Sequence, residues 1–262
     1  MTQHVLVTGG AGFIGSHLTR RLLARGDRVT VLDDFNDFYD PARKRINVAE
    51  FEGQEGYALI EGGITDGKLV DTLFERQRFD GVIHLAARAG VRPSLKQPLL
   101  YEEVNCIGTL HLLEAARRHG PEVFTFGSSS SVYGINTKVP FAESDEINQP
   151  ISPYATTKRT GELLCFNYHH LYGLKTSCLR FFTVYGPAQR PEMAIAKFTD
   201  LLARGQAIEM YGDGESRRDY TFIDDIIDGT IAAYDLAPDF EILNLGGADT
   251  TQIGRASCRE RV

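Results

Sequence analysis

The 262-residue sequence has no tryptophan and few sulfur-containing residues, with three methionines and four cysteines. The cysteines are scattered singly and form no Cys-x-x-Cys pair, so a zinc site is not expected, and we predict that no metal is bound. Reduced thiols in a cytoplasmic protein are the simplest interpretation. The four positions are Cys106, Cys165, Cys178 and Cys258.

Long runs of one charge are also missing, and the net charge is −7 at neutral pH. This balance argues against nucleic acid and against an anionic membrane surface as the main partner. No apolar stretch is long enough to span a bilayer, and the N-terminus leads into the strand-like run 5–10 without a charged leader. We therefore expect a protein of the cytoplasm.

What the sequence does contain is an alternation of short apolar runs and longer helical patterns. Hydrophobic residues make up 42% of the chain, which is enough for a sizeable core. Gly26 and Gly120 stand where helix C-caps would fall. The pattern predicts an α/β fold with a Rossmann-type, doubly wound parallel sheet covered by helices on both faces. The expected strands are 5–10, 28–34, 56–62, 81–87 and 122–128, and the expected helices are 13–26, 65–77 and 99–120.

The alternation of apolar runs and helical patterns ends after about Thr183, where shorter elements are separated by Pro and Gly. We interpret residues 1–182, with a return segment at about 219–236, as an NAD-binding domain. Residues 183–218 and 237–252 are expected to form a smaller, truncated C-terminal lobe for the substrate. Residues 253–262 show a sudden cluster of arginines and no amphipathic pattern, which predicts a non-native tail, with a genuine basic tail as the alternative.

A glycine-rich turn follows the first predicted strand and opens the first helix. Gly9, Gly12 and Gly15 match G-x-x-G-x-x-G, a spacing that lets the backbone approach a pyrophosphate at a helix N-terminus. Asp33 ends the second strand, where a carboxylate can bind a ribose 2′-hydroxyl, and no arginine stands beside it for a 2′-phosphate. The pattern favours NAD over NADP; the alternative is a structural turn beside a solvated Asp pair.

The stretch 152–164 places Tyr154 and Lys158 four residues apart, on one face of a helix. A tyrosine titrates near pH ~10, so we expect the lysine ammonium, together with a cationic nicotinamide, to favour the phenolate. Tyr154 could then remove a hydroxyl proton while hydride leaves the same carbon. A solvated helix face is the alternative for this pair.

Four segments together resemble the extended short-chain dehydrogenase/reductases, in the epimerase and dehydratase group that acts on nucleotide sugars. They are TGGAGFIGSHL, HLAA, SSSSVYG and YATTK, and the resemblance covers residues 4 to about 252. It implies that Ser129 assists Tyr154 and that Ser130 and Ser131 lie close to the sugar. It also implies a set of NAD contacts: Gly9, Gly12, Phe13, Ile14, Gly15, Asp33, Asp66 on the adenine, Leu85, Ala86, Ala87, Asn105, Tyr154 and Lys158.

The four consecutive serines 128–131 contain no acidic residue among them. Relatives that dehydrate sugars carry an Asp-Glu pair in this loop, and relatives that decarboxylate a uronic acid usually keep a Glu before Val-Tyr-Gly. The resemblance therefore implies C4 epimerisation through a 4-keto intermediate. By resemblance Arg218 contacts the diphosphate, and Thr183 and Arg190 lie near a substrate carboxylate.

Several stretches resemble the UDP-glucuronate 4-epimerases more than the galactose enzymes, so we predict conversion of UDP-glucuronate to UDP-galacturonate. A 4-epimerase for UDP-glucose and UDP-galactose, a UDP-glucuronate decarboxylase and a non-catalytic NAD-sensing protein stay open as alternatives. The resemblance also implies a homodimer formed by helices around residues 100–118 and 153–172. His84 ends a strand without an acidic or cysteine partner nearby, which predicts a packed, hydrogen-bonded histidine.

Overall fold

The computed structural model describes residues 2–208, 213–215, 217–247 and 250–252. The predicted non-native tail, residues 253–262, lies outside these described residues. Among them, no helix is both long and apolar enough to cross a lipid bilayer.

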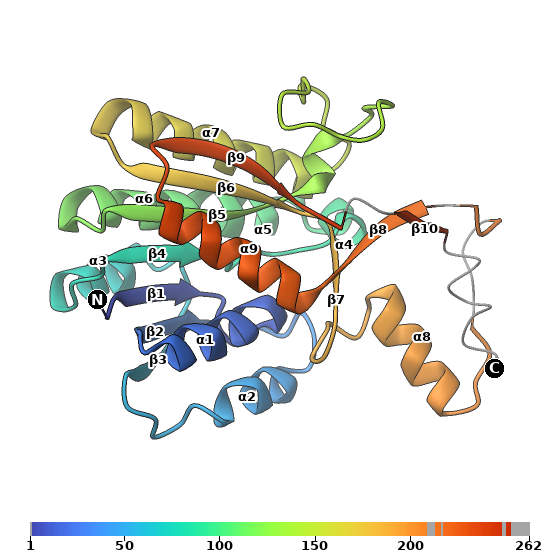
Figure 1. Ribbon diagram of the computed structural model, residues 1–262, viewed down its shortest axis with the longest axis horizontal. Helices are drawn as coiled ribbons and strands as arrows, with labels where there is room; N and C mark the ends of the chain where they lie inside the picture. The colour runs from blue at the N-terminus through green and yellow to red at the C-terminus, as the bar shows by residue number, and fades with distance from the viewer. Residues whose placement is uncertain (1, 209–212, 216, 248–249, 253–262) are drawn as a thin grey trace.

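A seven-stranded parallel sheet forms the centre of the molecule (Figure 1). Its strand order is β3-β2-β1-β4-β5-β6-β9, so the chain starts in the middle and winds outward in both directions. All five predicted strands belong to it, and the prediction of a Rossmann-type sheet is confirmed. The strands are β1 His4–Thr8, β2 Arg28–Asp33, β3 Tyr57–Glu61, β4 Gly81–His84, β5 Val123–Ser129, β6 Lys175–Phe181 and β9 Phe240–Leu245.

Helices cover both faces of this sheet, because alternate side chains of each strand point to opposite faces. Val5 and Val7 of β1 pack in one core with helices α1 (Phe13–Arg25) and α9 (Ile223–Leu236). Leu6, between them, packs in a second core with α3 (Gly67–Arg76), α6 (Gly108–His119) and α7 (Pro153–Tyr172). A strand buried on both faces explains the continuous apolar runs in the sequence.

The helix boundaries follow local signals, and two of them were predicted. Gly26 and Gly120 adopt left-handed φ values of 93° and 83° as C-caps of α1 and α6. The predicted helix 99–120 is instead three consecutive pieces with a π-helical turn in the middle: α5 Pro98–Glu102, η1 Glu103–Ile107 and α6. The remaining helices are α2 Pro41–Ala49, α4 Val91–Lys96, η2 Ser130–Tyr133 and α8 Ala194–Ala203.

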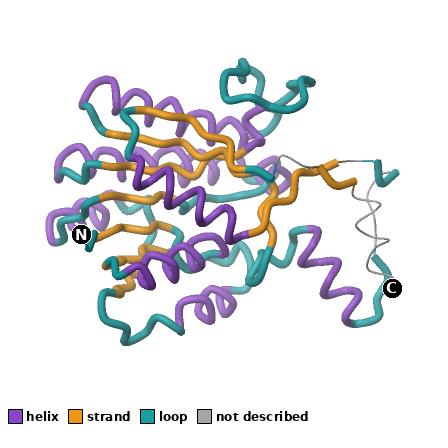
Figure 2. The backbone as a smooth tube through the Cα atoms, viewed as in Figure 1, coloured by secondary structure: helices purple, strands orange, loops and turns teal. Residues whose placement is uncertain are grey.

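A second, three-stranded sheet and α8 lie beyond the carboxyl ends of the main strands (Figure 2). Its order is β10-β8-β7, with β7 Thr183–Tyr185, β8 Arg217–Phe222 and β10 Thr250–Gln252. The predicted lobe boundary needs one correction, since residues 237–252 are not all in this smaller part. Strand β9 pairs with β6 in the main sheet, where its alternating apolar side chains Ile242 and Phe240 reach the core.

Candidate active site

One pocket lies at the carboxyl ends of the central strands, where parallel sheets of this topology bind ligands. Residues from the first glycine turn, from the ends of β2, β4 and β5, and from α7 all line it. It brings together most of the residues that the sequence singled out. The predicted residues in its wall are Gly9, Gly12, Phe13, Ile14, Gly15, Asp33, Leu85, Ala86, Ala87, Ser129, Tyr154, Lys158 and Arg190.

The glycine turn forms a cradle at the start of α1, and two of its glycines leave no space for a side chain. Gly9 has φ +72°, and a Cβ there would lie 2.7 Å from the backbone nitrogen of Ala86. A Cβ on Gly15 would lie 2.2 Å from the Gly9 carbonyl oxygen. Gly12 is the N-cap of α1 and brings no side-chain cap, so the first N–H groups of the helix face the pocket without a side-chain partner. This arrangement fits the pyrophosphate of a dinucleotide.

Asp33 closes the other side of this cradle at the end of β2. Its carboxylate accepts hydrogen bonds from the backbone N–H of Ala11 at 3.1 Å and of Phe35 at 2.9 Å. Burial raises the pKa of Asp33, and the nearby Lys44 ammonium opposes that rise. The carboxylate is therefore held in place at the pocket wall, as a ribose-binding group requires.

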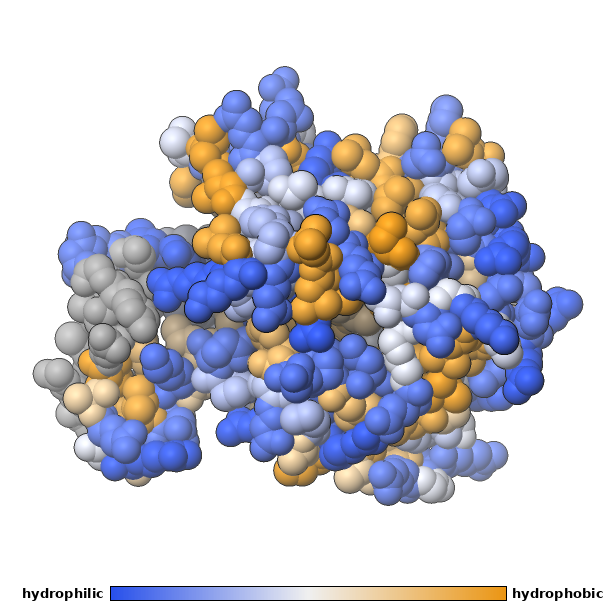
Figure 3. All heavy atoms as spheres, turned by 180° about the vertical axis from the view of Figure 1, so that it is seen from behind, coloured by the Kyte–Doolittle hydropathy of each residue, from blue (hydrophilic) through white to orange (hydrophobic). Residues whose placement is uncertain are grey.

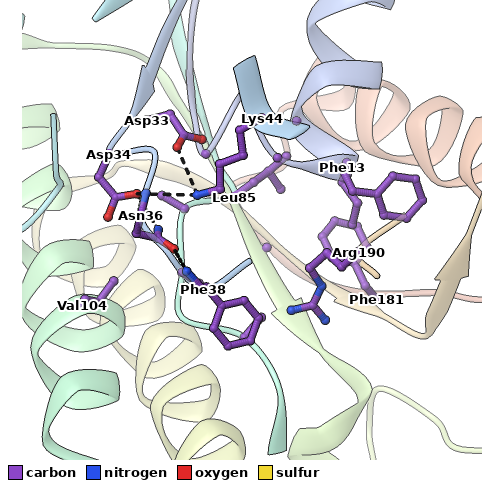
Figure 4. Close-up of a pocket in the computed structure, with 18 of the residues that line it drawn as sticks. Phe13, Asp33, Asp34, Asn36, Phe38, Lys44, Leu85, Val104, Phe181 and Arg190 are labelled. Atoms are coloured by element: carbon purple, nitrogen blue, oxygen red, sulfur yellow. Dashed lines mark hydrogen bonds and ion pairs between the residues drawn. The ribbon is translucent and has the colours of Figure 1, made fainter. Parts of the chain in front are cut away.

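Lys44 is a pocket residue that the sequence reasoning missed. It lies on α2, is buried, and reaches between Asp33 and Asp34, with its Nζ 3.6 Å and 3.9 Å from their Oδ1 atoms (Figure 4). Asp40 caps α2 and Pro41 begins it, a start signal that could have revealed this helix in the sequence. A predicted helix at this place would have put a cation beside the acidic pair.

The start of α7 positions Tyr154 and Lys158. Ser152 caps the helix through the Ala155 N–H at 3.1 Å, and Pro153 is its first residue. A Cβ on Gly161 would lie 2.2 Å from the Phe126 ring, so only glycine lets α7 approach β5 this closely. Tyr154 and Lys158 consequently line the same pocket, as their four-residue spacing predicted.

The electrostatics of this pair differ from the expectation. Burial raises the pKa of Tyr154, and the groups that oppose the rise are a hydrogen bond from Ser129 and the charge of Arg190. Lys158 instead donates to the Gly127 carbonyl oxygen at 2.6 Å. Burial lowers the pKa of Lys158 to about 8. In this structure Ser129 and Arg190, rather than Lys158, are therefore the groups that favour the phenolate.

The last residue of β5 and the first two of η2 form a short hydrogen-bonded serine segment, Ser129–Ser131. Ser129 is the N-cap of the turn η2, and its Oγ accepts from the Ser131 N–H at 3.2 Å. The Ser129 hydroxyl also lies 3.2 Å from the Ser131 hydroxyl oxygen. Ser129 lines the pocket, whereas Ser130 and Ser131 do not line it.

Four further predicted residues lie outside the pocket wall, as do Ser130 and Ser131. Asp66 caps α3, where its Oδ1 accepts from the backbone N–H groups of Lys68 and Leu69. Asn105 bonds to the backbone of Arg88 and to the Thr157 hydroxyl, so it braces the wall from behind. The other two are Thr183, at the start of β7, and Arg218, in β8.

Arg190 enters the pocket from the loop after β7. Its guanidinium lies 5.6 Å from the centre of the Phe38 ring, and Phe38 also lines the pocket (Figure 4). Glu192 lies 3.2 Å from its Nη1. The positive charge of Arg190 lowers the pKa of the Tyr154 phenol, so the guanidinium acts on the catalytic end of the pocket.

The interpretation of His84 as a packed residue is confirmed. Its side chain is 1% exposed and bridges two hydroxyls, Thr8 Oγ1 at 2.7 Å from Nδ1 and Thr109 Oγ1 at 2.9 Å from Nε2. Burial, with a smaller effect of the Lys158 charge, lowers the pKa of His84 to about 3. A neutral histidine with both ring nitrogens engaged has a structural role under the pocket floor.

Comparison with known proteins supports this site. A model of the NAD dependent epimerase/dehydratase family matches residues 5–246. The chain belongs to this family. The resemblance drawn from the motifs is thereby confirmed, and so is NAD as the cofactor of the family.

Individual relatives agree with the family assignment. UDP-glucuronate 4-epimerase 3 of Arabidopsis thaliana is 48% identical over 237 residues, which cover 89% of this chain and 55% of that protein. UDP-glucuronate 4-epimerase of Thermodesulfobacterium geofontis is 45% identical over 245 residues, 93% of this chain and 75% of that protein. The chain thus spans little more than half the length of the plant relatives it matches.

Solved structures show the same fold. A UDP-glucuronic acid 4-epimerase from Bacillus cereus, in complex with UDP-glucuronic acid and NAD, matches with a TM-score of 0.89 at 36% identity. The match covers 95% of this chain and 79% of that one. A UDP-glucose 4-epimerase from Thermotoga maritima with UDP-glucose matches with a TM-score of 0.87 at 34% identity, over 97% of this chain and 80% of that one.

Proposed function

We propose that the chain epimerises C4 of a UDP-linked uronic acid and interconverts UDP-glucuronate and UDP-galacturonate with NAD as cofactor. Relatives named UDP-glucuronate 4-epimerase, at 48% and 45% identity, support the substrate class. The glycine cradle and the fixed Asp33 support NAD binding. The observation that carries the choice of reaction is the distribution of carboxylates around the pocket.

Among the described residues that line the pocket, the acidic ones are Asp33 and Asp34. Both follow β2, which is three strands away from β5 and its serines in the order β2-β1-β4-β5. At a strand spacing of about 4.8 Å, the two ends of the pocket are on the order of 14 Å apart. The Tyr154 end therefore lacks the additional acid and base that elimination of water requires.

The proposed reaction uses one proton shuttle and one hydride shuttle, and each group leaves the sugar and then returns to it. Tyr154 removes the proton of the C4 hydroxyl, assisted by the hydrogen bond from Ser129. Bound NAD would supply the hydride acceptor for C4 and the hydride that returns to the opposite face of the sugar ring. Lys158, buried and anchored on the Gly127 carbonyl, stays within the pocket to hold the nicotinamide ribose. Tyr154 finally returns its proton to the C4 oxygen.

The substrate carboxylate needs a firm hold, because a uronic acid oxidised at C4 is a β-keto acid that readily loses CO₂. Arg190 offers a guanidinium that suits a carboxylate through two parallel hydrogen bonds. Ser130, Ser131 and Thr183 offer neutral donors, and Arg218 is proposed for the diphosphate. These four residues lie outside the pocket wall in this structure, so their assignment rests on the resemblance.

Product analysis with UDP-glucuronate tests the proposal. We expect UDP-galacturonate to appear without added NADH, in a ratio that approaches equilibrium from either sugar. Release of CO₂ with UDP-xylose would identify a decarboxylase instead. Conversion of UDP-glucose to UDP-galactose, without reaction of the uronic acid, would identify a neutral-sugar epimerase. NAD binding without any conversion would point to the dinucleotide-sensing alternative.

We further propose that two copies pair through α5, η1 and α7. These packed elements carry exposed hydrophobic side chains: Leu99, Ile107, Leu163, Phe166 and Leu171. Seen from behind, the surface shows hydrophobic side chains among polar ones (Figure 3). Leu163→Asp should convert a dimer to a monomer in light scattering after gel filtration, whereas Ile46→Asp on α2 should not. A monomeric wild-type chain would contradict the pairing.

We also retain a cytoplasmic location as a proposal. The three cysteines in the described part of the chain, Cys106, Cys165 and Cys178, are buried and free, which suits a reducing compartment. Fractionation of cells that express the protein would test it, and recovery with the membrane or outside the cell would contradict it.

A further inference from the structure

A buried ion pair lies next to the pocket, and the proposed reaction does not use it. Arg180 of β6 is 1% exposed and is the largest fully buried side chain in the described part of the molecule. Its Nε and Nη2 donate to the two carboxylate oxygens of Glu162 on α7, at 2.9 Å and 3.0 Å. A buried ion pair contributes little net stability, because desolvation of both charges offsets their attraction. Its geometric effect on its neighbours is therefore the more informative property.

The pair holds the serine segment at its first end. Ser128 donates its hydroxyl to Oε1 of Glu162 at 2.6 Å. Ser128 directly precedes Ser129, which hydrogen-bonds with Tyr154. Glu162 stands on the same helix as Tyr154, two turns later. The carboxylate thus ties the strand that carries Ser129 to the helix that carries its partner.

The pair also holds the serine segment at its second end. Nη1 of Arg180 donates to the Tyr133 hydroxyl oxygen at 3.0 Å, and Tyr133 is the last residue of η2. The Tyr133 hydroxyl in turn donates to Oδ1 of Asn244 on β9 at 2.7 Å. The Tyr133 ring stacks on Phe141 with 4.4 Å between ring centres. Ser128, directly before Ser129–Ser131, and Tyr133, two residues after Ser131, are therefore both fixed by one buried network.

We propose that Glu162 and Arg180 are positioning residues that hold Ser129, Ser130 and Ser131 in place against Tyr154 and the sugar. The proposal rests on the proposed epimerase reaction for its kinetic consequences. Charge-assisted bonds inside a protein are short and directional, and a network of them fixes its members more tightly than apolar contacts do. Catalytic groups need this support, because displacement by about 1 Å can lower a rate about a hundredfold.

Hydrogen exchange tests the positioning role without any need for turnover. In Ser128→Ala and Tyr133→Phe, each of which removes one hydroxyl of the network, we expect faster amide exchange in a peptide that spans residues 127–134. Arg159→Ala is the matched control. Arg159 approaches the same Glu162 carboxylate at 3.0 Å, from a partly exposed position, and it makes no hydrogen bond to the serine segment in the described part of the chain. This control should leave the exchange of the peptide as in the wild type.

Kinetics test the consequence for the reaction. Ser128→Ala and Glu162→Gln should lower kcat about tenfold to a hundredfold, with the affinity for NAD unchanged. The alkaline shift of the pH profile is the decisive readout. Loss of the Ser129 hydrogen bond removes a group that lowers the pKa of Tyr154, so the rising limb should move to higher pH. Arg190, which also lowers that pKa, and the edge-on ring of Tyr101 stay in place as before.

The outcomes separate the two proposals. If the wild-type chain does not convert UDP-glucuronate, the proposed function fails, and the exchange of residues 127–134 alone decides the positioning role. If the wild type is active and the variants keep its kcat, its pH profile and its exchange, the positioning role is overturned. A loss of stability in Glu162→Gln without faster exchange in Ser128→Ala would likewise overturn it, because that result indicates a purely structural pair.

Discussion

Helices α7 and α8 both stand beside the proposed site, yet they are held in opposite ways. α7 buries seven residues against the sheet, and Gly161 allows a close contact with Phe126 of β5. α8 contains Ile195, Phe198, Leu201 and Leu202, and no residue of this helix is buried. The more apolar helix of the two is thus the less buried one, so apolar content alone does not determine how firmly a helix packs.

This difference separates the part that would hold the cofactor from the part that would hold the sugar nucleotide. The glycine cradle, Asp33, Tyr154 and Lys158 all stand on elements of the doubly covered sheet. Arg190 stands between the small sheet and α8, on a loop. Elements with few buried apolar contacts open at low free energy, so we expect the substrate side to be the more dynamic one.

The largest expected effect is a loss of turnover, without a loss of stability, in a variant of the well-packed part. Tyr154→Phe removes the proposed base and leaves the ring in its contact with Tyr101. We expect turnover of UDP-glucuronate to fall by a factor of about 100 to 10,000, with NAD binding and the melting temperature close to wild type. Assays of sugar products and of NAD binding check this together. Unchanged turnover would refute the role of Tyr154.

A pair of truncations measures the contrast between the two parts directly. Phe124→Ala removes a fully buried ring from β5 and should lower the free energy of unfolding by about 3 to 5 kcal/mol. Phe198→Ala removes a ring of the same size from α8 and should lower it by less than about 1 kcal/mol. Urea unfolding of both variants gives the comparison. Equal losses would show that α8 is packed as firmly as the sheet.

The sheet and the cofactor side were predictable because their signals are local. The glycine spacing, the apolar runs and the C-caps at Gly26 and Gly120 each depend on a few neighbouring residues. The Tyr154 and Lys158 pair was predictable for the same reason, since one helical turn places both on one face. These signals need no knowledge of distant parts of the chain.

The remaining features depend on contacts between segments far apart in the sequence. Strand β9 was assigned to the small lobe, because a short apolar run does not show which sheet it joins. The ion pair of Glu162 and Arg180 joins a helix to a strand 18 residues away, and no motif marks it. The lowering of the Tyr154 pKa was assigned to Lys158, its neighbour on the helix, whereas the groups that lower it in the structure are Ser129, from β5, and Arg190, from a distant loop.

Lowering the pH should reduce the free energy of unfolding through His84, which lies in the main sheet. Its pKa of about 3 in the folded chain lies below the ordinary value of 6.5, because burial disfavours the charged ring. Below pH 6.5 the unfolded chain therefore binds a proton that the folded chain does not, and stability falls as pH falls toward 3. Between pH 7 and pH 5 this loss is about 2 kcal/mol.

Urea unfolding at both pH values, in the wild type and in His84→Gln, checks the contribution of this histidine. Glutamine retains hydrogen-bonding groups for Thr8 and Thr109 but does not titrate. The difference between pH 7 and pH 5 should therefore be smaller in the variant by about 2 kcal/mol. An equal difference in both proteins would mean that other groups, and not His84, cause the acid sensitivity.

The smallest expected effect concerns the choice between NAD and NADP on the cofactor side. Asp33→Ser removes a carboxylate that would repel a 2′-phosphate, and with it one of the two carboxylates that the Lys44 ammonium approaches, at 3.6 Å in the wild type. The ammonium can then pair with the phosphate. We expect the ratio of NADP to NAD affinity to rise about tenfold, equivalent to about 1.4 kcal/mol. Asp34→Ser is the matched control, because Asp34 lies 3.9 Å from the same ammonium but is more exposed. Calorimetric titration with both dinucleotides gives the ratio, and an equal rise in the two variants would show that overall charge, rather than the position of Asp33 at the ribose, determines cofactor preference.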